Sequence, residues 1–103
     1  MLFRSTLEEI KESVKCIFDE GNDELVLLHC VSDYPANVEE SNLRAIIELK
    51  KEFDIPVGFS DHAIGDSISL TASILGANVI EKHMRHPDNG FFPDDVHSLT
   101  PDQ

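Results

Sequence analysis

Two histidines carry the strongest indication of chemistry in this sequence. His62 ends the segment Gly-Phe-Ser-Asp-His at residues 58–62, and His83 ends Ile-Glu-Lys-His at residues 80–83. If the two segments are neighbouring parallel strands, both imidazoles lie at the same edge of one sheet, close enough to bind a single divalent metal ion. A shared metal site is one interpretation, and an ordinary hydrogen-bonded role for each ring is the other.

The residue types beside this pair suit metal-assisted chemistry. A neutral imidazole nitrogen is a good ligand for Mn, Fe, Co or Zn, and two such ligands with a carboxylate or water leave an open site that polarises a carbonyl. Because side chains alternate along a strand, Ser60 shares a face with His62, and Glu81 shares a face with His83. We therefore expect Ser60 and Glu81 to accompany the two histidines.

Three carboxylates are candidates for binding the metal or orienting a histidine: Glu81, Asp61 and Asp94. Structural roles stay open as alternatives. Asp61 suits the cap of the following turn, and Glu81 suits an ion pair with Lys82 or another cation.

Other polar residues give weaker indications. Tyr34 precedes a proline, so its hydroxyl either enters the same cleft or belongs to a structural turn. Lys82 should point to the opposite face of its strand from its neighbours and pair with an acidic helix end. His29 lies among apolar residues and is interpreted as a buried, hydrogen-bonded side chain. His86 and His97 lie in loop sequence and receive no role.

The elements that must position these residues follow from the apolar pattern. Ser5 and Glu8 have the spacing of a capping box, and an amphipathic helix is predicted from there to Gly21. The same pattern predicts further helices over 43–53 and 66–76, and strands over 24–30, 55–60 and 78–82.

Helices and strands therefore alternate, which is typical of an α/β fold with a parallel sheet. The C-terminal ends of parallel strands share one edge, so ligands should bind there. Three strands leave two sheet edges unpaired, which indicates that another chain completes the sheet or that the sequence belongs to something larger.

Composition sets further bounds. The chain has 103 residues, 41% of them hydrophobic, which suits one domain with a core. Its formal net charge of -12 argues against nucleic acid or an anionic membrane as a partner. Cys16 and Cys30 show no C-x-x-C spacing, so a cytoplasmic protein is favoured. Neither a signal peptide nor an apolar run of membrane-spanning length is recognised.

A series of motifs in a fixed order adds a resemblance. The motifs are Leu27-Leu28-His29-Cys30, Ser32-Asp33-Tyr34-Pro35, Val57-Gly58-Phe59-Ser60-Asp61-His62, Ile80-Glu81-Lys82-His83, Pro93-Asp94 and Ser98-Leu99. Together they resemble the sialic acid (N-acetylneuraminate) synthase family, from about Ser5 to Gln103. Members of that family condense phosphoenolpyruvate with N-acetylmannosamine or a related N-acetylated aminosugar.

The resemblance implies a partial (β/α)8 TIM barrel. Residues 1–103 would be the C-terminal portion of the catalytic barrel domain, with its last three strands and their helices. The earlier strands, and a small C-terminal domain that closes the site of the partner subunit, would lie outside the chain. The family also implies a homo-oligomer, a dimer in the full-length proteins.

The resemblance also implies roles for single residues. His62 and His83 become the ligands of a divalent metal, usually Mn²⁺, with Mg²⁺ and Co²⁺ as alternatives, and Glu81 joins them as a catalytic carboxylate. Ser60 falls where a serine contacts the phosphate of phosphoenolpyruvate. The positions implied for further substrate contacts are Tyr34, Asp94 and Ser32.

The chain departs from the family near the sugar site. It has Phe92-Pro93-Asp94-Asp95 where relatives often read Gly-Pro-Asp-His, and residues 86–90 replace a more usual Thr-Leu-Asp stretch. Two alternatives therefore stay open beside the synthase. One is a non-catalytic fragment that self-associates, and the other is a related phosphoenolpyruvate-dependent synthase of 3-deoxy-sugar phosphates.

Overall fold

The elements of the chain are seen in a computed structural model, which describes residues 5–31, 35–86 and 92–103. Ser32 and Tyr34 lie outside these residues, so the contacts predicted for them stay predictions. The helices are α1 (Leu7–Asp19), α2 (Arg44–Glu52) and α3 (Ser67–Ile74), the strands are β1 (Leu27–Cys30), β2 (Val57–Asp61) and β3 (Ile80–Lys82), and two 3-10 helices are η1 (Val38–Glu40) and η2 (Pro93–His97). The predicted alternation of helices and strands is confirmed.

The capping box of helix α1 lies one residue later than predicted. Thr6, not Ser5, is the N-cap: its hydroxyl accepts from the Glu9 amide, and its own amide donates to the Glu9 carboxylate at 2.7 Å. Two acidic residues follow one another here, so the spacing alone fitted two registers, and the prediction took the wrong one. The helix stops as predicted, because Gly21 takes a φ of +82° that favours glycine.

The three strands form one parallel sheet in the order β1-β2-β3. Ser60 stands opposite Cys30 on one side and opposite Glu81 on the other, so all three strands end at the same edge. Strands β1 and β3 are shorter than predicted at their starts. Within residues 5–31, 35–86 and 92–103 each of them pairs only with β2, and β2 itself begins at Val57, directly after a proline that has no amide to donate.

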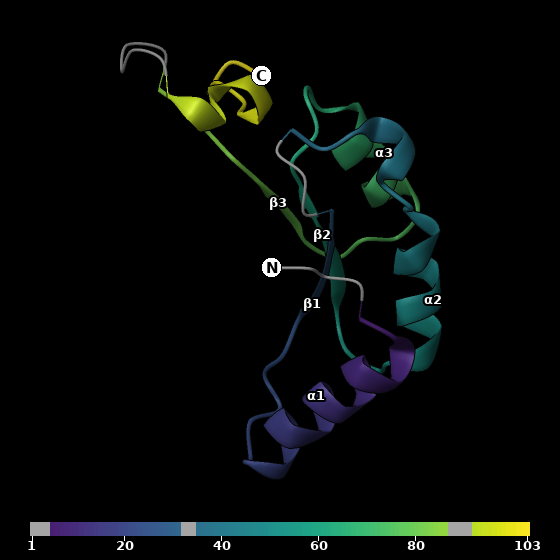
Figure 1. Ribbon diagram of the computed structural model, residues 1–103. Helices are drawn as coiled ribbons and strands as arrows, with labels where there is room; N and C mark the ends of the chain where they lie inside the picture. Colours follow the sequence, from purple (N-terminus) through teal and green to yellow (C-terminus); the bar gives the residue numbers. More distant parts are fainter. Residues whose placement is uncertain (1–4, 32–34, 87–91) are drawn as a thin grey trace.

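One face of the sheet, the helix face, packs against α2 and α3, which lie on the same side of the strands (Figure 1). From β2, Val57 and Phe59 are buried there. The buried cluster consists of Ile46, Val57, Phe59, Ala63, Ile68 and Ala72. This apolar layer holds the strands at fixed positions under the helices.

The opposite face, called the open face below, carries Leu28, Cys30, Gly58, Ser60 and Glu81. At Gly58 a Cβ atom would lie 2.3 Å from the Val79 carbonyl oxygen, so only glycine allows β3 to approach this closely. A hollow of about 1020 Å³ is lined in part by this face. Leu28 keeps 39% of its surface exposed, which shows that the hollow is not filled by described residues.

The C-terminal segment lies beyond the end of β3 (Figure 1). Its backbone is tied to that strand end: the Leu99 amide donates to the His83 carbonyl, and the Arg85 amide donates to the Leu99 carbonyl, both at 2.9 Å. These bonds bring η2 back to the edge where the strands end. In the described part of the chain, no helix has the length and apolar character needed to cross a membrane.

Candidate metal and substrate site

The structure brings His62 and His83 together at the edge where the strands end. His62 follows β2 and His83 follows β3, and their ring centroids are 5.4 Å apart with planes inclined at 62°. His62 is buried, with 6% of its surface exposed, whereas His83 is half-buried. The predicted proximity of the two imidazoles is confirmed.

The His62 ring is oriented by the end of β1. Its Nδ1 lies 3.3 Å from the Val31 carbonyl oxygen and 3.4 Å from the Cys30 sulfur. A carbonyl oxygen only accepts, so a hydrogen bond to Val31 is made by the tautomer that carries its proton on Nδ1. This is the arrangement of a histidine that binds a metal through Nε2, with its other nitrogen held by a backbone carbonyl.

Ser60 and Glu81 form a hydrogen-bonded pair on the same face as the histidines. The Ser60 hydroxyl donates to Glu81 Oε1 at 2.7 Å, and the two residues stand opposite each other in the sheet. Their predicted placement on one face is confirmed. The alternative ion pair between Glu81 and Lys82 is wrong, because consecutive residues of a strand point to opposite faces.

Asp61 and Lys82 instead form a buried ion pair on the helix face. Asp61 Oδ2 lies 3.2 Å from Lys82 Nζ, and Oδ1 accepts from the Ala63 amide at 2.8 Å. The side chains are 0% and 7% exposed. Asp61 therefore caps the turn after β2, and its interpretation as a carboxylate beside the metal is wrong. Lys82 is structural as predicted, but its partner ends a strand, not a helix.

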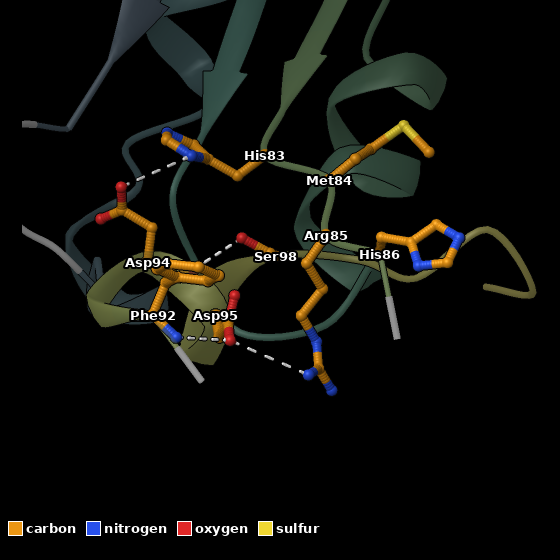
Figure 2. A pocket seen from close by; sticks show the side chains of 8 residues that line it. All are labelled: His83, Met84, Arg85, His86, Phe92, Asp94, Asp95 and Ser98. Carbon is orange, nitrogen blue, oxygen red and sulfur yellow. Dashed lines mark hydrogen bonds and ion pairs between the residues drawn. The ribbon is translucent and has the colours of Figure 1, made fainter. Parts of the chain in front are cut away.

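Asp94 lies beside two histidines, as Figure 2 shows for His83. Its Oδ2 is 4.0 Å from His83 Nδ1, and its Oδ1 is 3.7 Å from His97 Nε2. The carboxylate is 61% exposed, so it remains accessible from the mouth of the site. The sequence prediction that Asp94 belongs near the histidine pair agrees with this geometry.

His97 is the residue that sequence reasoning missed. It lies in η2, is only 1% exposed, and has ring centroids 4.8 Å from His83 and 6.0 Å from His62. A usable signal was its spacing of three residues from Asp94, which places both on one side of a helical turn. Burial and the neighbouring His83 lower the pKa of His97, so its neutral form is favoured.

The remaining histidines lie apart from this group. His29 Nε2 is 2.8 Å from the Ser41 carbonyl oxygen, and the centroid of its ring is 5.6 Å from that of Phe59 on the helix face. Its predicted hydrogen bond is confirmed, but the side chain is half-buried and not fully buried as predicted. His86 is exposed. It lines a smaller pocket of about 260 Å³ beside the site (Figure 2), whose wall consists of His83, Met84, Arg85, His86, Phe92, Asp94, Asp95 and Ser98.

The smaller pocket contains positions at which the sequence departs from the family that it resembles. Arg85 Nη1 lies 4.0 Å from Asp95 Oδ2, and the same oxygen accepts from the Phe92 amide at 2.8 Å. Asp95 thus caps the start of η2 and links that turn to Arg85, which follows β3. Because His83 lines both this pocket and the large hollow, a ligand in either one reaches His83.

The donor set fits a divalent ion held by two histidines. Within residues 5–31, 35–86 and 92–103, no group of three or more His, Cys, Asp and Glu side chains has the arrangement of a metal centre. Two imidazoles alone leave most coordination positions for water or for substrate oxygens, as in an open catalytic site. The neutral nitrogen donors suit Mn, Co and similar ions better than Ca.

The fold and site define a parallel α/β unit with polar chemistry at the ends of its strands. Residues 4–103 match the NeuB family profile, and the chain belongs to that family. It is 43% identical to an N,N'-diacetyllegionaminic acid synthase of Campylobacter jejuni, over 96% of this chain and 30% of the relative. It is also 41% identical to an N-acetylneuraminate-9-phosphate synthase of Mus musculus, over 77% of this chain and 21% of the relative.

Solved structures agree with this membership. An N-acetylneuraminic acid synthetase from Leptospira borgpetersenii, in complex with citrate, superposes with a TM-score of 0.83 at 39% identity, covering 96% of this chain and 34% of that one. A spore coat polysaccharide biosynthesis protein of Bacillus subtilis gives a TM-score of 0.84 at 36% identity, covering 95% of this chain and 28% of that one. The chain thus spans about a third of the length of these relatives.

Proposed function

We propose that this chain is the metal-binding C-terminal portion of a (β/α)8 barrel that condenses phosphoenolpyruvate with an N-acetylated aminosugar. One water molecule would be consumed, and the products would be a sialic-acid-type nonulosonate and phosphate. One observation carries the proposal: the 5.4 Å pair of His62 and His83 lies on the open face beside Ser60 and Glu81. Relatives named as legionaminic and sialic acid synthases support the class of product.

The barrel is supported by the incomplete sheet. In the described residues, β1 and β3 pair only with β2, and the open face borders the large hollow. Further parallel strands would cover both edges and close this face, as in a barrel interior. The length of the relatives is sufficient for those strands. We place the assembled enzyme in the cytoplasm as a homodimer.

Different residues of the chain are assigned to the metal ion and to phosphoenolpyruvate. A bound divalent ion, Mn²⁺ by preference and Mg²⁺ or Co²⁺ as alternatives, would polarise the sugar aldehyde oxygen. Val31 holds the Nδ1 side of His62, and Nε2 is the nitrogen assigned to the metal. Ser60 is assigned to the phosphate of phosphoenolpyruvate: its hydroxyl, which donates to Glu81 in the absence of substrate, would rotate to donate to a phosphate oxygen.

The aminosugar is assigned to the mouth of the site. Asp94 is exposed there and lies within 4.0 Å of His83, so its carboxylate can accept from a sugar hydroxyl beside the histidine pair. Tyr34 and Ser32 are assigned to the same substrate on the family resemblance. Phe92 lines the adjacent pocket and is a candidate for setting which sugar is accepted.

A chimaeric enzyme tests this function. Residues 4–103 replace the matching segment of the Campylobacter jejuni synthase, and phosphate release is measured with phosphoenolpyruvate, an N-acetylated aminosugar and Mn²⁺. We expect metal-dependent turnover that falls to background in His62→Ala, because one of two protein ligands is lost. His86→Ala is the matched control and should retain turnover. Undiminished manganese-dependent turnover in His62→Ala would refute the assignment.

The acceptor panel separates the two synthase classes. An N-acetylated aminosugar should be consumed, and a phosphorylated aldose without an N-acetyl group should not. The reverse preference would assign the site to the 3-deoxy-sugar-phosphate synthases.

The alternative of a non-catalytic unit rests on the open face and the two unpaired strand edges in the described residues. It is tested on the 103-residue chain alone by mass measurement in solution and by the same phosphate assay. A stable, inactive oligomer supports this alternative for the isolated chain, whereas turnover excludes it.

A further inference from the structure

The His97 ring packs against the rings of both candidate metal ligands, His62 and His83. Its ring stands at 78° to that of His83 and at 82° to that of His62, with centroid distances of 4.8 and 6.0 Å. The two interplanar angles and the two centroid distances all lie in the range of edge-to-face ring packing, which is directional. Because His97 is almost completely buried, its ring has little room to leave this position.

The backbone couples His97 to one of the rings it contacts. Two residues after His97, the Leu99 amide donates to the carbonyl of His83 at 2.9 Å. On the other side of the turn, the Ser98 hydroxyl donates to the Asp94 carbonyl at 2.6 Å, and the Ser98 amide donates to the Asp95 carbonyl at 3.2 Å. A shift of η2 would therefore move His97 and disturb the end of β3 together.

We propose that His97 is a positioning residue of the metal site, which fixes the angle between the His62 and His83 rings without binding the ion itself. The inference rests on the proposed function, because it takes those two rings as the ligands. A flexible pair of imidazoles would have to be ordered by the ion, whereas a pair held by a third ring is ordered beforehand. Such preorganisation raises affinity without adding a ligand.

The geometry favours packing over direct ligation by His97. Its Nε2 lies 3.7 Å from Asp94 Oδ1, so a carboxylate stands beside this nitrogen. Among the described residues, moreover, the three histidines do not form a three-ligand metal group. A residue that acts through its ring shape should be replaceable by another aromatic ring, and a ligand should not. That difference defines the experiment.

The experiment measures metal binding by the 103-residue chain and its variants, with no turnover involved. Mn²⁺ affinity is obtained from the electron paramagnetic resonance signal of the free ion, and the ligand set is monitored by the visible absorption of bound Co²⁺. We expect His97→Ala to weaken Mn²⁺ binding by roughly 10- to 100-fold, the usual loss when a supporting residue is removed. His97→Phe should restore affinity to within a few-fold of the parent, with an unchanged Co²⁺ spectrum.

Two controls separate this inference from its foundation. His86→Ala removes an exposed histidine from the same region and should bind like the parent chain. His62→Ala and His83→Ala should abolish binding. If the parent chain binds no Mn²⁺ or Co²⁺, the metal site fails and the inference falls with it. If the parent chain binds the ion and His97→Ala binds it equally well, while His62→Ala and His83→Ala do not bind it, the inference alone is overturned.

The aromatic variant decides the remaining outcomes. Equal loss of affinity in His97→Phe and His97→Ala, with a changed Co²⁺ spectrum, would make His97 a ligand and overturn its positioning role. Circular dichroism checks the fold of each variant. Should His97→Ala fail to fold, the result for His97→Phe stands alone, and loss of its affinity overturns the proposal, whereas retention supports it.

Discussion

Neighbouring residues of β2 lie in different environments on the two faces of the sheet. On the helix face, Phe59 is 2% exposed inside an apolar cluster. On the open face, the next residue, Ser60, is bonded to a carboxylate beside the large hollow. A single step along β2 thus separates the side chains that stabilise the fold from those that are placed for chemistry. The alternation of a strand makes this division unavoidable.

Their polar pairs differ in the same way. Asp61 on the helix face accepts from the Ala63 amide, from the Ser69 hydroxyl and from Lys82, and both members of the ion pair are buried. Glu81 on the open face is exposed and accepts from Ser60. The first pair satisfies polar groups that burial would otherwise penalise, and the second leaves a carboxylate accessible to a ligand. Burial therefore distinguishes a structural carboxylate from a candidate functional one.

The largest difference between the faces should appear on removal of Phe59. Phe59→Ala leaves a cavity in the buried cluster and should lower the free energy of unfolding by about 3–5 kcal/mol. Leu28→Ala, on the open face, removes a side chain that is 39% exposed and should cost about 1 kcal/mol. Urea denaturation followed by circular dichroism measures both. Equal losses would show that the open face is packed as tightly as the helix face.

The buried ion pair should give the next effect. Asp61→Ala leaves the Lys82 ammonium buried without its carboxylate, and should cost about 3 kcal/mol in unfolding free energy. Asp61→Asn keeps an acceptor for the Ala63 amide and should cost less. Thermal denaturation of the two variants provides the comparison. A loss below about 1 kcal/mol for Asp61→Ala would contradict the structural role assigned to the pair.

The open-face pair should give the smallest effect on stability. Ser60→Ala removes the donor to Glu81, but water can replace it at this exposed carboxylate, so about 1 kcal/mol or less is expected. In the chimaeric enzyme the same change should raise the KM for phosphoenolpyruvate. Ser73→Ala, an exposed helical serine bonded to the Ser69 carbonyl, is the control and should alter neither quantity. An unchanged KM in Ser60→Ala would remove that residue from the phosphate site.

Much of the site was predictable because it depends on local periodicity. The alternation of β2 and β3 predicted that Ser60 lies with Glu81, and the parallel order of the strands predicted that His62 lies near His83. The same alternation predicted that Lys82 points to the opposite face of β3 from Glu81. Errors arose where two local patterns were equally good, as at the start of α1, or where a partner depended on packing, as for Asp61.

The order of helices and strands, and the face on which each strand residue lies, can be read from the sequence because they follow from short-range sterics and apolar spacing. The approach of His97 to His62 and His83 depends instead on how the chain folds back on itself. That contact spans 35 positions from His62 and depends on backbone hydrogen bonds between Leu99 and the residues after β3. No local pattern encodes such a return of the chain, since it arises from bonds between segments that are distant in sequence.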